Sequence, residues 1–434
     1  MSLRFMLAAA VTLAACAGRT AEVSPAEIAE LQERVAREPG NGDAVLRLSA
    51  ALFSANRCDE AITTARTGMV LRPASALGPL VVGQCLERSE RFQDALSTYD
   101  AFLAAHPDAR GSDGVRGRRL LTERARATQS ARAALAREAE LAQTTLDPTV
   151  VAVLPLVIVG DSIYRPLSRG LAQMLTSDLA LLQRFRMVER LQLSALLDEM
   201  QLGQSERFDA STTARVGQLV QAGRMVQGLT QIPDENNVRL EASVVLSTGV
   251  VTAPEAVTGR LRDLLQMEKD IVVALAGRLG YQLSQAERTA ILENGTQNLA
   301  AFLAYSRGLE AEDLGDFSAA AMHFGQASQQ DPGFQAARTS HQAAQAAPTA
   351  QQASAGQVVQ VAQQVAEPPP AADEGGALGS GVADLAPTQS EATAAVSSNV
   401  TTQASSTSAS QPPPPPVTPP TTVTGTIRII FRLP

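Results

Sequence analysis

The chain has 434 residues, of which 45% are hydrophobic and 18% charged, and its formal net charge at pH 7 is −8. This length predicts two or three domains, and the acidic balance argues against nucleic acid as a partner. Only 3% of the residues are aromatic and tryptophan is absent, which suits helical repeats combined with a disordered region.

The first residues have the pattern of a bacterial lipoprotein signal peptide. Arg4 precedes an apolar run over 5–12, which is too short for a membrane-spanning helix of about 20 residues. The following sequence, LAAC at 13–16, resembles a lipobox, and this resemblance implies removal of residues 1–15 and lipidation of Cys16. An ordinary secretory signal that contains a cysteine is the alternative.

The residues after Cys16 bear on the final location. Ala17 in place of aspartate resembles the pattern that is sorted to the outer membrane, and 16–24 then form a tether. No later apolar stretch reaches transmembrane length, so the lipid is the expected membrane anchor. We therefore predict an outer-membrane, lipid-anchored protein that faces the periplasm.

Residues 25–110 show a repeat of helical hairpins. Prolines recur every 34 residues, at Pro39, Pro73 and Pro107. This period is typical of tetratricopeptide repeats, and the small residues Gly83 and Ala95 fit positions where two helices approach closely. Such repeats present a concave surface to a protein segment. We expect partner-binding residues on exposed positions of the first helices, at Arg47, Asn56, Gln84 and Arg88.

Two cysteines remain if Cys16 is acylated. Cys58 and Cys85 lie in neighbouring repeats, and an even number of cysteines in an oxidising compartment favours a disulfide. A disulfide here stabilises the fold by roughly 2–4 kcal/mol. Two buried free cysteines are the alternative.

Residues 111–147 are rich in alanine, arginine, glutamate and leucine, and predict a connecting helix. The segment contains a basic cluster of Arg116, Arg118, Arg119, Arg124 and Arg126. The cluster lacks aromatic residues and includes an acidic residue, so we interpret it as a solvated helix face and not as a nucleic-acid site.

Residues 148–285 alternate between strand and helix patterns. The predicted order is strand 149–159, helix 167–182, strand 185–190, helix 191–200, helix 211–221 capped by Asp209, strands 224–231 and 238–247, and helix 261–279. This order implies an α/β or α+β sheet with helices packed against it. The fold class is therefore multidomain, with α and α/β parts.

The same segment resembles the CsgG family of curli secretion lipoproteins. The matching blocks are VAVLP at 151–155, LSRGLAQMLTSDL at 167–179, RFRMVER at 184–190, LDE at 197–199, LGQS at 202–205, TARVGQL at 213–219 and GRMVQG at 223–228. The core also resembles the N-terminal domain of TolB and flagellar-assembly lipoproteins, so it indicates a fold more than an activity. The resemblance implies a periplasmic domain that acts in secretion or assembly.

In the curli protein the domain forms a ring, and each subunit contributes two long amphipathic hairpins to a pore. A membrane-spanning strand needs about 9–11 residues with alternating faces. Here only a short loop separates the strands that end at 231 and begin at 238, and 252–258 is too short for a hairpin and leads into a helix. We therefore do not expect this domain to form a pore. An oligomeric CsgG-type secretion channel component is the alternative prediction.

The sequence predicts no catalytic residue, no metal site and no cofactor. Asp161 and Ser162 follow the first strand, but the domain contains no histidine, so a turn and helix cap is favoured over a nucleophile. His106, His323 and His341 are far apart in the sequence and no cysteine–histidine cluster accompanies them.

The C-terminal part begins with one further tetratricopeptide-like repeat over 297–340, which we expect to pack on the central domain. Residues 341–421 are rich in proline, alanine, serine, threonine and glutamine and predict a disordered linker. In 422–434, Ile427, Ile429 and Phe431 alternate with polar residues, which predicts a strand that docks on this protein's sheet or on a partner. A remnant of a lost domain is the alternative.

Together these features predict a non-enzymatic, outer-membrane-tethered periplasmic lipoprotein. It acts as a protein-binding scaffold in secretion or cell-envelope assembly, with protein partners bound through the repeats and the membrane bound through the lipid at Cys16. Homo-oligomerisation is left open.

Overall fold

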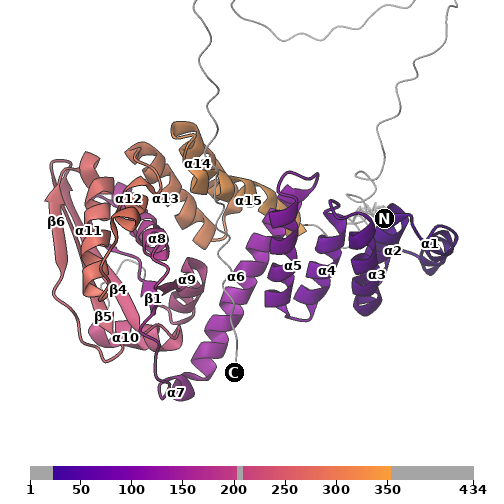
Figure 1. The fold of residues 1–434 in the computed structure, drawn as a ribbon, viewed down its shortest axis with the longest axis horizontal. Coiled ribbons are helices and arrows are strands. Elements are labelled where there is room, and N and C mark those ends of the chain that lie inside the picture. Colours follow the sequence, from indigo (N-terminus) through magenta and orange to yellow (C-terminus); the bar gives the residue numbers. More distant parts are fainter. Residues whose placement is uncertain (1–22, 203–208, 353–434) are drawn as a thin grey trace, which may run out of the picture. The chain divides into compact units, whose positions relative to one another are not determined.

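The structure, a computed structural model, describes residues 23–202 and 209–352. Cys16, the terminal strand predicted with Ile427, Ile429 and Phe431, and all linker residues from 353 on lie outside the described residues. Helices flank a β-sheet in the described part (Figure 1). None of the helices in these two ranges combines the length and the apolar character that a bilayer crossing requires.

The N-terminal helices pack as successive hairpins. They are α1 (Pro25–Arg37), α2 (Gly42–Ser54), α3 (Cys58–Leu71), α4 (Leu77–Arg88) and α5 (Phe92–Ala105). Helices α4 and α5 approach closely because a Cβ at Gly83 would overlap the ring of Tyr99, which is fully buried. The small residue that the sequence placed at Gly83 therefore sets the distance between these helices.

The connecting segment predicted over 111–147 contains two helices instead of one. Helix α6 (Ser112–Ala136) is followed by the single turn α7 (Glu138–Leu141). Figure 1 shows α6 running beside α5 and then α9, and it also packs against α15. The long helix thus joins the N-terminal hairpins to the sheet and to the last helix of the described chain.

The sheet is mixed and its strand order is β3-β1-β4-β5-β6, with β2 paired to β4 beyond the end of β1. The strands are β1 (Val150–Val153), β2 (Val157–Gly160), β3 (Arg186–Met187), β4 (Arg224–Asp234), β5 (Asn237–Leu246) and β6 (Glu255–Gly259). Strand β1 is parallel to both β3 and β4, whereas β4, β5 and β6 are antiparallel neighbours.

Helices cover both faces of this sheet. They are α8 (Leu167–Ala180) and α11 (Leu264–Arg278) on one face, and α9 (Arg190–Glu199) and α10 (Ala210–Leu219) on the other. Side chains alternate along a strand, so successive residues of β1 contact the helices on opposite faces of the sheet. Val151 and Val153 belong to the core with α8 and α11, whereas Ala152 and Leu154 belong to the core with α9 and α10.

Several predicted strands have different limits in the structure. The single strand predicted over 149–159 is two strands, because Pro155 cannot donate a ladder hydrogen bond and lies between β1 and β2. The strand predicted over 185–190 shrinks to β3, and Arg190 already begins α9. Residues 252–258 lead into a helix as predicted, since α11 follows, but the sequence missed that this segment first forms most of β6, which pairs with β5.

The C-terminal part of the described chain is helical. It comprises α12 (Gln285–Glu293), α13 (Leu299–Asp313), α14 (Phe317–Gln330) and α15 (Gln335–Gln352). Gly308 packs against the ring of Phe324 as Gly83 packs against Tyr99, with the same spacing in the sequence. Helix α13 packs on α8 of the sheet domain, in the way expected for an isolated hairpin that cannot bury its apolar face alone.

The prediction that a disordered linker begins at residue 341 was wrong for 341–352, because these residues belong to α15. Ala344 and Ala347 are fully buried. Alanine has the highest helix propensity, and a segment without large apolar side chains can still pack closely along another helix.

Candidate functional site

A groove of about 750 Å³ along the N-terminal helices is the candidate functional site. Helices α2, α4 and α6, the end of α3, the loops that precede α4 and α6, and the last turns of α15 form its walls. Its apolar lining includes four leucines: Leu46, Leu71, Leu77 and Leu80. The volume lies within the range of roughly 300–1,000 Å³ that ligand-binding pockets occupy, which is ample for several side chains of a bound segment.

Helix starts and close contacts position the walls. The Asn41 side chain accepts a hydrogen bond from the Ala44 backbone nitrogen at 3.1 Å and caps α2. Gly111 precedes α6 with φ of 90°, a conformation that favours glycine. In α6 itself, a Cβ at Gly117 would lie only 2.6 Å from the carbonyl carbon of Ala346, so glycine allows α15 to reach the groove.

The charged residues of the groove lining are mostly basic. They include Arg47, Arg72, Arg110 and Arg118, and the acidic member among them is Asp43. Arg72 forms an ion pair with Asp43 at 3.4 Å. The Nε of Arg47 is buried and has no hydrogen-bond partner within the described ranges. The site therefore combines apolar surface with positive charge, which favours a bound segment that carries both apolar and acidic side chains.

A buried cluster around Glu87 orients one of these arginines. Tyr99 Oη and Thr122 Oγ1 donate to Glu87 Oε1 at 2.6 and 2.7 Å, and Arg118 pairs with the same carboxylate. Burial raises the pKa of Tyr99 well above its ordinary value, and the charge of Glu87 raises it further. Arg118 also donates to the backbone oxygen of Ala350 at 3.2 Å, so the cluster links α4, α5 and α6 to the end of α15.

The structure separates the four predicted partner-binding residues into two pairs. Arg47 and Gln84 line the groove, but Gln84 is buried, with only 6% of its surface exposed, so its predicted exposure was wrong. Asn56 and Arg88 do not line the groove. Helical spacing of Leu77, Leu80 and Gln84 in α4 is the signal that would have identified its apolar wall.

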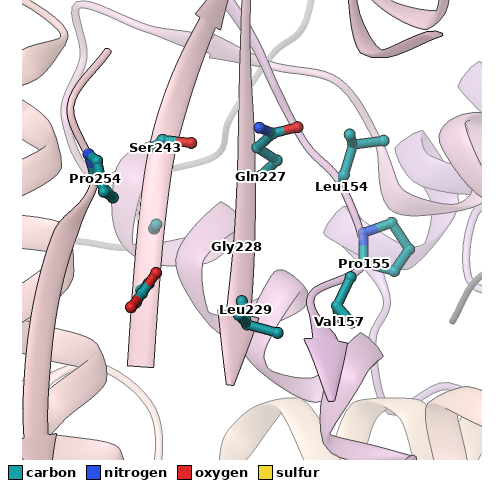
Figure 2. A pocket seen from close by; sticks show the side chains of 10 residues that line it. Leu154, Pro155, Val157, Gln227, Gly228, Leu229, Ser243 and Pro254 are labelled. Carbon is teal, nitrogen blue, oxygen red and sulfur yellow. The ribbon is translucent and has the colours of Figure 1, made fainter. Parts of the chain in front are cut away.

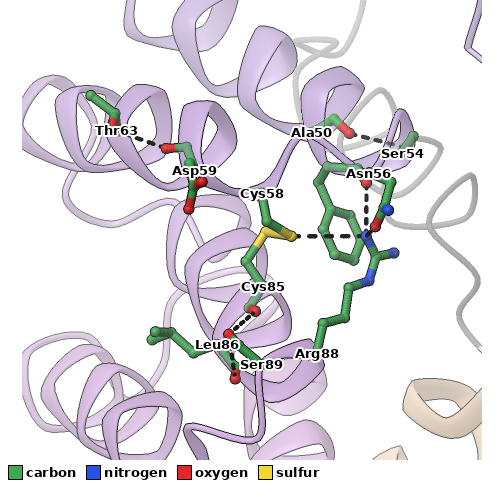
Figure 3. Close-up of a disulfide and its surroundings, with 11 residues drawn as sticks. Ala50, Ser54, Asn56, Cys58, Asp59, Thr63, Cys85, Leu86, Arg88 and Ser89 are labelled. Atoms are coloured by element: carbon green, nitrogen blue, oxygen red, sulfur yellow. Dashed lines mark hydrogen bonds between the residues drawn. A yellow bond between two sulfur atoms is a disulfide. The ribbon is translucent and has the colours of Figure 1, made fainter.

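Arg88 and Asn56 instead belong to the contact between two hairpins. Arg88 Nη1 donates to the Phe53 carbonyl at 3.0 Å and to Asn56 Oδ1 at 3.1 Å, and its guanidinium lies over the Phe53 ring (Figure 3). The structure joins Cys58 and Cys85 as a disulfide beside this contact, with their Cα atoms 5.4 Å apart. Arg88 and Asn56 thus hold α2 and α4 together where α3 begins.

The interpretation of the basic cluster in α6 as a solvated face was wrong for three of its members. Arg118 pairs with Glu87, Arg126 pairs with Glu189, and Arg124 donates to backbone carbonyls at the end of α13. These arginines cross from α6 to α4, α9 and α13, because their long side chains reach acceptors on elements that are far away in the sequence.

A second buried network surrounds Asp313 at the end of α13. Arg190 of α9 pairs with both Asp313 and Glu312, and Arg169 of α8 pairs with Asp313 at 2.7 Å. Only 3% of the Asp313 side chain is exposed. The network therefore fastens the C-terminal hairpin to the helices that cover the sheet, and the adjacent residues Glu189 and Arg190 each take a different partner.

The core of the sheet domain contains a buried cluster of two acids and a lysine. Lys269 Nζ lies 2.6 Å from Asp178 Oδ2 and 3.6 Å from Glu268 Oε2, and Asn294 donates to Asp178 Oδ1 at 2.7 Å. Glu268 is completely buried, and neither of its carboxyl oxygens has a hydrogen-bond partner in the part of the chain that the structure describes. Burial raises the pKa of Glu268 well above its ordinary value, and the charge of Asp178 adds to this effect.

The sheet domain has a small depression where β1 gives way to β2 (Figure 2). Leu154, Pro155, Gln227 and Ser243 are among its lining residues, and its volume is about 30 Å³. That space suffices for about one water molecule and not for a small-molecule substrate. Nearby, the Asp161 side chain accepts from the backbone nitrogen of Ile163 at 3.0 Å and caps a short helical turn.

No group of three or more histidine, cysteine, aspartate or glutamate side chains in residues 23–202 and 209–352 is arranged to hold a metal ion. The expectation that the chain is not an enzyme stays a prediction.

Comparison with known proteins finds a family match in the central segment. No curated protein matches the chain. A solved structure, "Structure of Naa15/Naa10 bound to HypK-THB", matches at 11% identity with a TM-score of 0.20, too low to establish a common fold. The match covers 76% of this chain and only 37% of that one. Residues 154–251, which run from the end of β1 to just beyond β5, match the family model "Curli production assembly/transport component CsgG".

Proposed function

We propose that this protein is a lipid-anchored scaffold of the bacterial outer membrane that binds a segment of another envelope protein in its groove. The scaffold acts in secretion or assembly and faces the periplasm. Residue Cys16 carries the anchor, the hairpins select the partner, and the sheet domain serves for docking or oligomerisation. The chain itself carries out no catalysis.

The groove is the observation that carries this proposal. Its volume of about 750 Å³, its leucine lining and its four arginines describe a site for a polypeptide with apolar and acidic side chains. The 34-residue spacing of prolines and the hairpins α2–α3 and α4–α5 support the assignment as tetratricopeptide repeats, whose first helices line the concave surface. The family match over 154–251 supports a role in envelope assembly or transport.

Site-specific photo-crosslinking on the full, lipidated chain tests this function. Two neighbouring residues of α3 form a matched pair, because Leu71 lines the groove and Val70 does not, although 82% of Val70 is exposed. A photoreactive residue at 71 is expected to give a discrete adduct with one envelope protein, and the same residue at 70 is not. The charge reversal Arg47→Glu should weaken the adduct at 71. Equal adducts at both positions would contradict partner binding in the groove.

The alternative is an oligomeric secretion channel component, which the family match favours. In the described structure β4 and β5 are joined directly by a tight turn at Glu235 and Asn236, and both strands belong to the sheet core. Native mass measurement on the detergent-extracted, lipidated chain separates the two functions. A closed ring of identical subunits supports the channel, and a monomer or dimer supports the scaffold.

A further inference from the structure

We propose that residues 357–366 of this chain, QVVQVAQQVA, are the resident occupant of the groove and compete there with any partner. The proposal rests on the proposed function in that it concerns the same groove. It adds a regulatory step, since binding of another protein then requires displacement of the chain's own segment.

The first support is the path of α15, which delivers the chain to the groove. Ala346, Thr349 and Ala350 near the end of this helix are themselves part of the lining. Arg118 Nη1 donates to the Ala350 carbonyl at 3.2 Å, and Gly117 contacts the backbone of Ala346 closely. Residue 353 and those after it therefore leave the described part of the protein beside the apolar lining.

The second support is the sequence that follows α15. Residues 353–356 are the small residues Ala, Ser, Ala and Gly, and the next residues carry Val358, Val361 and Val365. The spacings of three and four between these valines are the apolar period of an amphipathic sequence. They form the first cluster of branched apolar side chains after α15, and three consecutive prolines follow at 368–370. An amphipathic segment thus begins within a few residues of an apolar groove.

The third support is charge. Residues 339–366 contain no aspartate, glutamate, lysine or arginine, and then Glu367, Asp373 and Glu374 follow within a few residues. The groove lining has more arginines than acidic residues, and the buried Nε of Arg47 has no partner in the described ranges. A neutral apolar segment followed by carboxylates matches an apolar groove with basic side chains.

The short connection makes this occupant effective even if its intrinsic affinity is weak. A short flexible tether gives an effective concentration in the millimolar range. A segment with an intrinsic Kd of about 0.1 mM would then fill the groove in about nine molecules of ten. About one groove in ten is then free to bind a competing ligand. The apparent affinity of that ligand is therefore about tenfold weaker than its intrinsic affinity.

The test compares the full chain with a variant that combines Val358→Ser, Val361→Ser and Val365→Ser. The probe is a fluorescent synthetic peptide of residues 355–368, and its binding is measured by anisotropy. The variant is expected to bind the peptide about tenfold more tightly than the unchanged chain. Hydrogen exchange in α2 and α4 should also become faster in the variant, because the groove loses its cover.

Two sets of controls keep the test specific. A chain with the same kind of change elsewhere in the tail, Val382→Ser, Val396→Ser and Val400→Ser, should behave as the unchanged chain. Two further changes are added to the variant that carries serine at 358, 361 and 365. Leu71→Asp should abolish its peptide binding, whereas the adjacent Val70→Asp should leave binding intact, because Leu71 lines the groove and Val70 does not. Both substituted residues are partly or largely exposed, so the fold should tolerate them.

Three results would overturn the proposal. The first is equal peptide affinity of the unchanged chain and the serine variant, and the second is the absence of binding to either. The third is a concentration-dependent dimer that the serines abolish, because this would place the segment in the groove of a second copy. None of these results touches the crosslinking at position 71, so failure of this inference and failure of the proposed function are distinguishable.

Discussion

Replacement of Gly117 by alanine should loosen α15 from α6. A Cβ at this position lies 2.6 Å from the Ala346 carbonyl carbon and 2.8 Å from its oxygen, whereas ordinary contacts begin at 3.4 Å. The obstacle is helix backbone, so α15 must move by about 0.8 Å to relieve the overlap. Overpacking of this kind costs about 1–3 kcal/mol, whereas the better helix propensity of alanine, about 1 kcal/mol, stabilises α6 itself and not the docking of α15. We therefore expect α15 to lose about 1–3 kcal/mol of local stability.

Gly114→Ala is the matched control, because Gly114 lies one turn earlier in α6 and has no atom within 4 Å of a Cβ. This change should be neutral or stabilise the helix by up to about 1 kcal/mol. The two variants share the same helix and the same chemical change, and they differ in whether α15 lies against the new methyl group.

Hydrogen exchange measured by mass spectrometry on the full chain reports the local effect. In Gly117→Ala the amides of α15 should exchange roughly 5–150 times faster, as a loss of about 1–3 kcal/mol requires. In Gly114→Ala the same amides should exchange as in the unchanged chain. If α15 is protected equally in both variants, the close contact between Gly117 and Ala346 does not determine the docking of α15, and the reasoning fails.

Three further predictions concern buried groups. Burial raises the pKa of Glu268 above its ordinary value of 4.5, so the folded state keeps a proton that the unfolded chain releases. The free energy of unfolding must then fall as the pH rises from about 4.5 through the raised pKa. Glu268→Gln should make this fall smaller, as measured by urea titrations at several pH values. An unchanged pH profile in the variant would contradict the prediction. Loss of the disulfide in the double variant Cys58→Ser, Cys85→Ser should lower the free energy of unfolding by roughly 2–4 kcal/mol. The variant should have a lower Tm, and reductant should no longer change that Tm. A Tm equal to that of the unchanged, oxidised chain would count against the prediction. Arg190→Met should destabilise by about 3–5 kcal/mol because buried carboxylates lose their partner, whereas Arg239→Ala at an exposed pair should cost less than about 1 kcal/mol; similar losses would refute the role of burial.

Patterns that repeat along the chain were readable from the sequence. The 34-residue period and the small residue Gly83 predicted hairpins with closely packed helices, and the structure has such hairpins. The alternation of apolar runs predicted a sheet covered by helices, and the order and spacing of its sequence blocks led to the family whose model matches 154–251. Local periodicity suffices for these features because it depends on the geometry of a single helix or strand.

Contacts between distant segments were not readable in this way. Arg118 and Arg126 had the pattern of a solvated face, and their partners Glu87 and Glu189 lie on other helices. Strand β6 has only five residues and becomes a strand through its pairing with β5. In both cases a residue's environment is set by an element that folding brings beside it.

The kinds of elements, their approximate order and the two hairpin regions follow from local patterns in the sequence, since periodicity and small residues act locally. The position of the groove and the residues that form it depend on how distant segments pack together. Gln84 is buried in the groove while Arg88, one turn later in α4, holds two hairpins together away from it. Helix α15 joins the lining because Gly117 leaves space for its backbone, a complementarity of two surfaces more than 200 residues apart in the sequence.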